Sequence, residues 1–308
     1  MRRRPAAFAA VLFALPCLIA LVAGSASAGD VVSRCGESVC CCYQRTQSSG
    51  WKVLESKCFR IHYVGGSELA ERLVPICERN CHDLRSRWLG VVRQGGWSVK
   101  CDVYLYPTGA EFERRSRFPQ QMWGVADLSV GDGRVWMRRL HVRTDDRDKL
   151  ENVLVHELTH VVLAERFTDR QIPRWADEGI AVLSEPAERR EHYAEWLRQE
   201  ASSRRLYSLR ELTRFAHVPQ GERQSELFYG QSGALVEYLL TERKLSEAEI
   251  LKLIDDVQRR GWESAVSKQF PTLSSVRFES EWRDWLLSRP ATEIAASVAP
   301  SASAFAAP

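Results

Sequence analysis

The chain has 308 residues, of which 44% are hydrophobic and 27% are charged, the balance of a globular protein with a sizeable core. Its formal net charge is only +3, and the basic residues are interspersed with acidic ones instead of being gathered in a stripe. The charge pattern therefore argues against a nucleic-acid-binding protein.

The first 28 residues predict a secretory signal peptide. Three arginines at positions 2–4 precede an apolar run at 6–24, and small residues at Ala26 and Ala28 predict cleavage after Ala28. The apolar run also approaches membrane-spanning length, so an uncleaved anchor is the alternative. We expect cleavage and export to the periplasm or the extracellular space, with membrane attachment only if the segment is retained.

The cysteines agree with export. Apart from Cys17 in the apolar run, eight remain, all in the first third of the chain: Cys35, Cys40, Cys41, Cys42, Cys58, Cys77, Cys81 and Cys101. In an oxidising compartment this even number predicts up to four disulfides, whose pairing the sequence does not define. A thiolate metal cluster is the less favoured interpretation, because adjacent cysteines cannot comfortably ligate one tetrahedral ion. Residues 29–50 are thus predicted to be a cysteine-rich extended segment.

Residues 51–140 predict a small mixed sheet with helices. Alternating apolar residues indicate strands at 58–64, 99–107 and 133–140, with His62 half-exposed on the first. Residues 68–90 show helical spacing, but Pro75 must kink this helix or begin a second one. A short helix follows the strand at 99–107.

Residues 141–289 predict a mainly helical region. Acidic and capping residues at 144–148 favour the start of the first helix, and its apolar residues recur at helical spacing. Further helices are predicted at roughly 174–185, 187–203, 208–216, 225–242, 246–259 and 275–288. The Ala- and Ser-rich tail at 290–308 is predicted to be disordered. We therefore predict an α+β fold, in which the sheet half packs on the helical half to form one domain at 51–289.

The segment VLVHELTHVV at 153–162 contains the strongest chemical signal. His156 and His160 lie one helical turn apart on one face, where both imidazoles can reach one metal ion. Glu157 lies beside His156, where its carboxylate can activate a water molecule for attack on a carbonyl. With 7 histidines and 40 acidic residues, chance alone gives about 0.02 such patterns per chain. The alternative is an ordinary amphipathic helix with solvent-exposed histidines.

A catalytic zinc ion usually takes three protein ligands, so a third is required. Pro173 favours a helix start, and Glu178 on that helix lies eighteen residues after His160, far enough for an antiparallel return. Asp177 is the competing ligand, with a shorter side chain on a different face.

HELTH at 156–160 and PRWADEGIAVLSE at 173–185 resemble the gluzincin zinc metallopeptidases, most closely the bacterial peptidase MA-like domains. VYLYPTGAEFERR at 103–115, WGVADLSVGDGRVWM at 123–137 and LFYGQSGALVEYLL at 227–240 extend this similarity over roughly 51–245. The resemblance implies a zincin-like fold and a Zn²⁺ ion. It assigns His156, His160 and Glu178 as metal ligands and Glu157 as the general base.

Tyr229 matches a tyrosine that stabilises the oxyanion in related peptidases, although a packing role is equally compatible with its helix. Tyr238 is a weaker alternative. Residues 124–126 and the strand at 133–139 could pair with substrate backbone. No glutamate motif for a free amino terminus is visible there, which favours an endopeptidase over an aminopeptidase.

The sequence thus predicts a zinc metallopeptidase acting on peptides or proteins. Two alternatives stay open: a non-catalytic zinc-containing binding or scaffold protein of the cell envelope, and a zinc hydrolase of a non-peptide bond.

Overall fold

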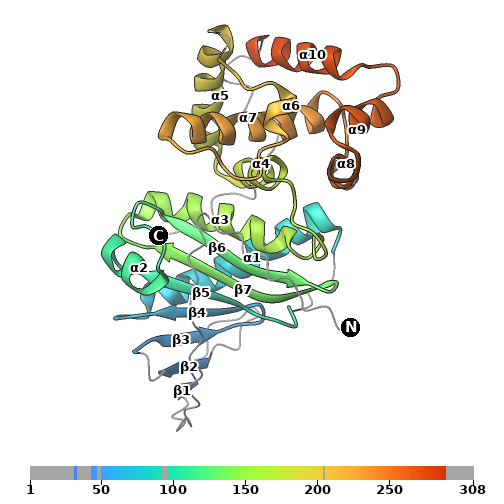
Figure 1. The fold of residues 1–308 in the computed structure, drawn as a ribbon. Helices are drawn as coiled ribbons and strands as arrows, with labels where there is room; N and C mark the ends of the chain where they lie inside the picture. Colours follow the sequence, from blue (N-terminus) through green and yellow to red (C-terminus); the bar gives the residue numbers. More distant parts are fainter. Residues whose placement is uncertain (1–30, 33–42, 47–49, 92–95, 204, 289–308) are drawn as a thin grey trace, which may run out of the picture. The chain divides into compact units, whose positions relative to one another are not determined.

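The computed structural model describes residues 31–32, 43–46, 50–91, 96–203 and 205–288 (Figure 1). The chain divides into two compact units, a sheet unit (1–82 and 93–161) and a helical unit (83–92 and 162–308). One mixed sheet with a mostly helical remainder confirms the predicted α+β class. The predicted signal peptide, most of the cysteine-rich segment and the tail lie outside the described residues.

The sheet unit contains a seven-stranded mixed sheet in the order β1-β2-β3-β4-β5-β7-β6. Its strands are β1 (Val31–Val32), β2 (Tyr43–Thr46), β3 (Lys52–Glu55), β4 (Phe59–Tyr63), β5 (Cys101–Tyr106), β6 (Gly124–Gly131) and β7 (Arg134–Arg143). β5 runs parallel to both β4 and β7, and the other pairs are antiparallel. The crossovers are made by α1 (Glu68–Leu89) and by the stretch containing α2 (Gly109–Ser116) and β6. β6 is an edge strand.

The two faces of the sheet differ in chemistry. Ile61, Val103 and Leu140 are register partners on one face and are completely buried. On the other face the rings of His62 and Tyr104 stack at 4.3 Å, and Tyr104 stacks on His141 at 5.2 Å. The prediction that His62 is half-exposed was wrong, because this ring stack covers it and its Nε2 pairs with Asp102 at 2.7 Å.

Sequence periodicity missed four strands and misjudged α1. β1, β2 and β3 are short and β6 begins and ends with glycine, so pairing with their neighbours decides their structure. α1 is one continuous helix that contains Pro75, and no second helix begins there. Leu73, Val74, Ile76 and Cys77 around the proline are all buried. Their burial offsets the roughly 3 kcal/mol that an interior proline costs a helix.

The disulfide prediction is not confirmed for the described cysteines. Cys58, Cys77, Cys81 and Cys101 are buried thiols in this structure, which contains no disulfide among the described residues. The sulfurs of Cys58 and Cys81 make a hydrogen-bond contact and not a covalent bond. The remaining predicted partners, at 35–42, lie outside the described residues.

The helical unit confirms most of the predicted helices. They are α4 (Arg174–Ser184), α5 (Ala187–Ser202), α6 (Leu209–Leu212), α7 (Glu222–Thr241), α8 (Glu247–Arg260), α9 (Trp262–Gln269) and α10 (Ser275–Ser288). α9 was missed, because Gly261 ends α8 and begins α9 without an intervening loop. Gly261 has φ 79°, a left-handed value that glycine adopts without strain.

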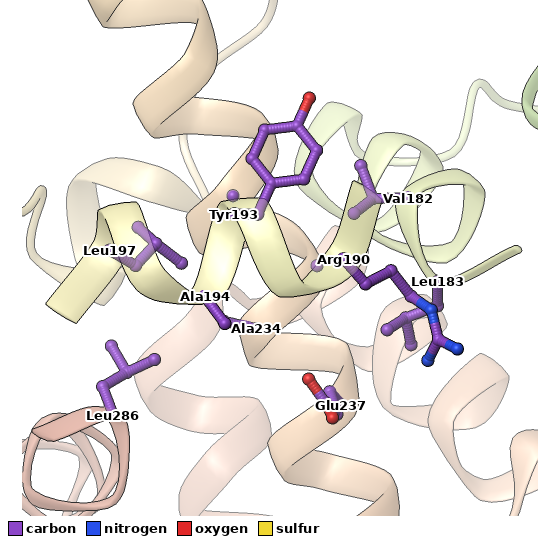
Figure 2. Close-up of a pocket in the computed structure, with 11 residues that line it drawn as sticks. Val182, Leu183, Arg190, Tyr193, Ala194, Leu197, Ala234, Glu237 and Leu286 are labelled. Carbon is purple, nitrogen blue, oxygen red and sulfur yellow. The ribbon is translucent and has the colours of Figure 1, made fainter. Parts of the chain in front are cut away.

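A small pocket lies among α5, α7 and α10, with Arg190, Glu237 and Leu286 among its lining residues (Figure 2). Its volume of about 20 Å³ accommodates a single water molecule and no peptide side chain. Within the described ranges, no helix is both long and apolar enough to cross a membrane.

Candidate metal centre

The helix α3 (Arg147–Leu163) carries the two histidines. Asp146 begins it, because its carboxylate accepts a hydrogen bond from the backbone N–H of Lys149 at 3.2 Å. Leu150, Leu154 and Leu158 recur every fourth residue and are at most 2% exposed. This apolar stripe fixes the rotation of α3 and thereby the direction of its polar residues.

His156 and His160 project from α3 one turn apart, as predicted. Their ring centroids are 5.0 Å apart and the ring planes are inclined at 74°. His160 is buried and His156 is half-buried. Two adjacent imidazoles at this inclination can direct one nitrogen each toward a common point.

The helix α4 carries Glu178 and is buried along almost its whole length, from Trp175 to Ser184. It crosses α7 closely at two glycines. A Cβ atom on Gly179 would approach the carbonyl oxygen of Ser232 to 2.5 Å, and one on Gly233 would approach Val182 Cγ1 to 2.7 Å. The absence of side chains at these positions permits the close helix contact that holds Glu178.

One ligand atom each from His156, His160 and Glu178 lies within 4.8 Å of the other two. Ligands about 2.1 Å from a tetrahedral ion stand about 3.4 Å apart, so side-chain movements of about 1 Å close this group around an ion. Two imidazoles and one carboxylate are the donors of several catalytic zinc sites, and they leave a fourth position open. The residues therefore fit a metal ion. Asp177, the competing ligand, is not part of the group.

Arg174 forms ion pairs with the two neighbouring carboxylates of α4. Its Nη1 lies 3.1 Å from Asp177 Oδ2 and 3.4 Å from Glu178 Oε1. Burial lowers the pKa of Arg174, but Asp177, Glu178 and Tyr229 together raise it above its usual value. A permanent positive charge thus balances two buried carboxylates on α4. Sequence reasoning missed Arg174, although its spacing of four from Glu178 is a recognisable helix-pair signal.

Glu157 is half-buried on α3, next to the first residue of β6. A Cβ atom on Gly124 would lie 3.0 Å from Glu157 Cγ and 3.2 Å from Glu157 Oε1. The predicted base therefore lies directly beside the beginning of the edge strand. No sequence pattern connects Gly124 with Glu157, because their close contact depends on how α3 packs on the sheet.

The two tyrosines of α7 have different surroundings. Tyr229 is half-buried and its phenol is close enough to Arg174 to affect its pKa. Tyr238 is buried, its ring packs on Phe278 at 5.5 Å, and its hydroxyl is contacted by Arg243. Tyr238 is therefore a packing residue, whereas the catalytic role of Tyr229 stays a prediction.

Comparison with known proteins places this geometry in a family. The sequence model of the peptidase MA superfamily matches residues 95–288, which contain both motifs, the strands β5, β6 and β7, and every helix from α2 to α10. No curated protein matches the chain. The matched region is more than half of the chain, and the protein therefore belongs to the peptidase MA superfamily, whose members are typically metal-dependent peptidases.

Proposed function

We propose that this protein is an exported zinc peptidase that hydrolyses bonds within peptides or proteins. The observation that carries the proposal is the meeting of His156, His160 and Glu178, with Glu157 adjacent to the first histidine. These three residues hold the ion in this proposal. When bound, Zn²⁺ supplies a Lewis acid that polarises the substrate carbonyl and makes a water molecule more acidic near neutral pH.

Glu157 is the general base. Its carboxylate removes a proton from the water molecule as the water oxygen forms a bond to the carbonyl carbon. The protonated Glu157 then delivers that proton to the amide nitrogen as the C–N bond breaks. The carboxylate is thereby regenerated, and the products are a carboxylic acid and an amine, between which the second proton of the water passes to give a carboxylate and an ammonium group.

The edge strand β6 orients the substrate. Its outer side offers backbone N–H and C=O groups to an extended peptide, because β7 occupies only the inner side. Gly124 at the start of β6 abuts Glu157, so a peptide added to this edge passes the base. Tyr229 donates its phenolic O–H to the oxyanion of the tetrahedral intermediate, an interaction that stabilises the transition state.

The test compares metal content with peptide cleavage. The purified protein should contain one zinc ion per chain and cleave members of a broad peptide library. Glu157→Gln should keep the zinc and lose about a thousandfold in kcat/KM, because the amide cannot accept the proton. Glu151→Gln places the same substitution on the same helix, away from the ligand group, and should leave kcat/KM unchanged. If the zinc-loaded wild type cleaves no peptide, the peptidase proposal is wrong and a zinc-containing binding protein is favoured.

Export is part of the same proposal and has a separate test. The basic start, the apolar run and the small residues before position 29 support it. Sequencing the amino terminus of the protein recovered from its native host should find a chain beginning at Gly29. A chain beginning at Met1 in the membrane fraction would favour the retained anchor.

A further inference from the structure

The turn at residues 56–58, which joins β3 to β4, is fastened to the middle of α1. Ser56 Oγ donates a hydrogen bond to Glu78 Oε1 at 2.7 Å, and the backbone N–H of Cys58 donates to the same oxygen at 2.6 Å. The N–H of Ser56 donates to the carbonyl of Phe59 at 2.8 Å and closes the turn. One carboxylate of α1 therefore fixes the position of Cys58.

Cys81 lies three residues after Glu78, on the same face of α1. The helix geometry thus brings Cys81 to the turn that Glu78 holds, and the thiols of Cys58 and Cys81 are in hydrogen-bond contact. Both side chains are nearly completely buried. This contact joins two segments that the chain itself separates by a strand and most of a helix.

Two other thiols lie nearby but differ in reactivity. Cys77 and Cys101 are completely buried, and burial raises the pKa of both. The hydrogen bond from Cys81 instead lowers the pKa of Cys58, against the opposing effects of burial and of the Glu78 carboxylate. Because the thiolate is the nucleophile in disulfide exchange, Cys58 is more easily activated than Cys77 or Cys101.

We propose that Cys58 and Cys81 form a disulfide that cross-links α1 to the turn before β4, while Cys77 and Cys101 stay thiols. The oxidant is a low-molecular-weight disulfide such as oxidised glutathione. The Cys58 thiolate attacks one glutathione sulfur and releases one glutathione thiolate, which leaves a mixed disulfide. The Cys81 thiolate then attacks the Cys58 sulfur and releases the second glutathione. The two cysteines lose two protons and two electrons, which reduce the glutathione disulfide to two thiols.

The two sulfurs must close from hydrogen-bond contact to a bond of about 2.05 Å. The proposal uses none of the metal ligands and does not rest on the peptidase activity. It resolves one of the disulfide pairings that the cysteine count alone leaves undefined.

Trypsin can separate all four thiols. It cleaves after Lys57, Arg60, Arg79 and Lys100, so Cys58, Cys77, Cys81 and Cys101 fall in four different peptides. The full chain is refolded in oxidised and reduced glutathione, alkylated, digested and analysed by mass spectrometry without reduction. We expect a cross-link between peptide 58–60 and peptide 80–85, with Cys77 and Cys101 alkylated. A link from Cys58 to any other cysteine, or an alkylated Cys58 in the oxidised sample, overturns the proposal.

A second measurement uses stability. A cross-link over this loop should raise the thermal midpoint of oxidised wild type by about 6–12 °C over the reduced protein. Cys58→Ser and Cys81→Ser should each abolish that difference, whereas the matched control Cys77→Ser should retain it at a lower midpoint. If Cys77→Ser abolishes the difference and Cys81→Ser does not, the pairing is wrong. If a variant fails to fold, the mass-spectrometric disulfide mapping of the wild type alone decides which cysteines are paired.

Discussion

The sheet unit and the helical unit hold their functional residues in different ways. In the sheet unit, α3 packs through one apolar stripe, and His156 and Glu157 on its polar face are only half-buried. In the helical unit, α4 is buried from Trp175 to Ser184 and meets α7 at glycines. Substitutions on the polar face of α3 should therefore be able to abolish catalysis while leaving the fold intact. Substitutions around Glu178 should instead affect metal binding and the stability of the fold together.

The largest expected effect on stability comes from Gly179→Ala. The added methyl group meets the Ser232 carbonyl oxygen at 2.5 Å, and neither backbone can move freely. The clash outweighs the roughly 1 kcal/mol that alanine gains in a helix, so the free energy of unfolding should fall by about 2–3 kcal/mol.

Gly124→Ala is the counterpart in the sheet unit. Its new Cβ meets the Val153 and Glu157 side chains, so it should cost about 1 kcal/mol while lowering kcat/KM. If urea unfolding shows that Gly179→Ala and Gly124→Ala lose the same free energy of unfolding, the proposed difference between the two units is wrong.

Tyr229→Phe tests whether the helical unit contributes a catalytic group as well as a ligand. Loss of the phenolic O–H should lower kcat about a hundredfold and leave zinc content unchanged, because the oxyanion loses a donor. Tyr238→Phe removes a hydroxyl from the buried core of the same helix and should leave kcat unchanged. Similar kcat values for wild type and Tyr229→Phe would assign Tyr229 to packing.

Acid should weaken the sheet unit through His141. Burial, with help from Arg139 and His62, lowers the pKa of His141 from 6.5 to about 4. The unfolded chain therefore binds the proton more readily than the folded protein, so stability is lost as the pH falls from 6.5 toward 4. This residue alone should remove about 2 kcal/mol of unfolding free energy between pH 7 and pH 5. The loss should be smaller in His141→Gln, and an identical pH profile for both proteins would contradict this origin.

The sequence was most informative where local pattern and tertiary role coincide. The helices carrying His156, His160 and Glu178 were predicted because capping, apolar spacing and liganding residues agree along each segment. α9 was missed because it begins directly after Gly261, where α8 ends, and β6 was missed because its structure depends on pairing with β7. Gly124 carries no chemical group that indicates a role, and the spacing of four between Arg174 and Glu178 indicates an ion pair but not a place beside a metal site. The roles of Arg174 and Gly124 follow only from their contacts with Glu178 and Glu157 in the folded protein.

The proposed metal ligands are best tested by measuring zinc affinity in two variants of neighbouring residues on α4. Both Asp177 and Glu178 are buried and contact Arg174, so their replacements disturb the surroundings similarly. Competition with a chelator should show that Glu178→Ala weakens zinc binding by at least about a hundredfold, whereas Asp177→Ala changes it less than about tenfold. The thermal midpoints of the metal-free variants control for unfolding. If Asp177→Ala loses zinc and Glu178→Ala retains it, the assignment of His156, His160 and Glu178 as the metal ligands is wrong.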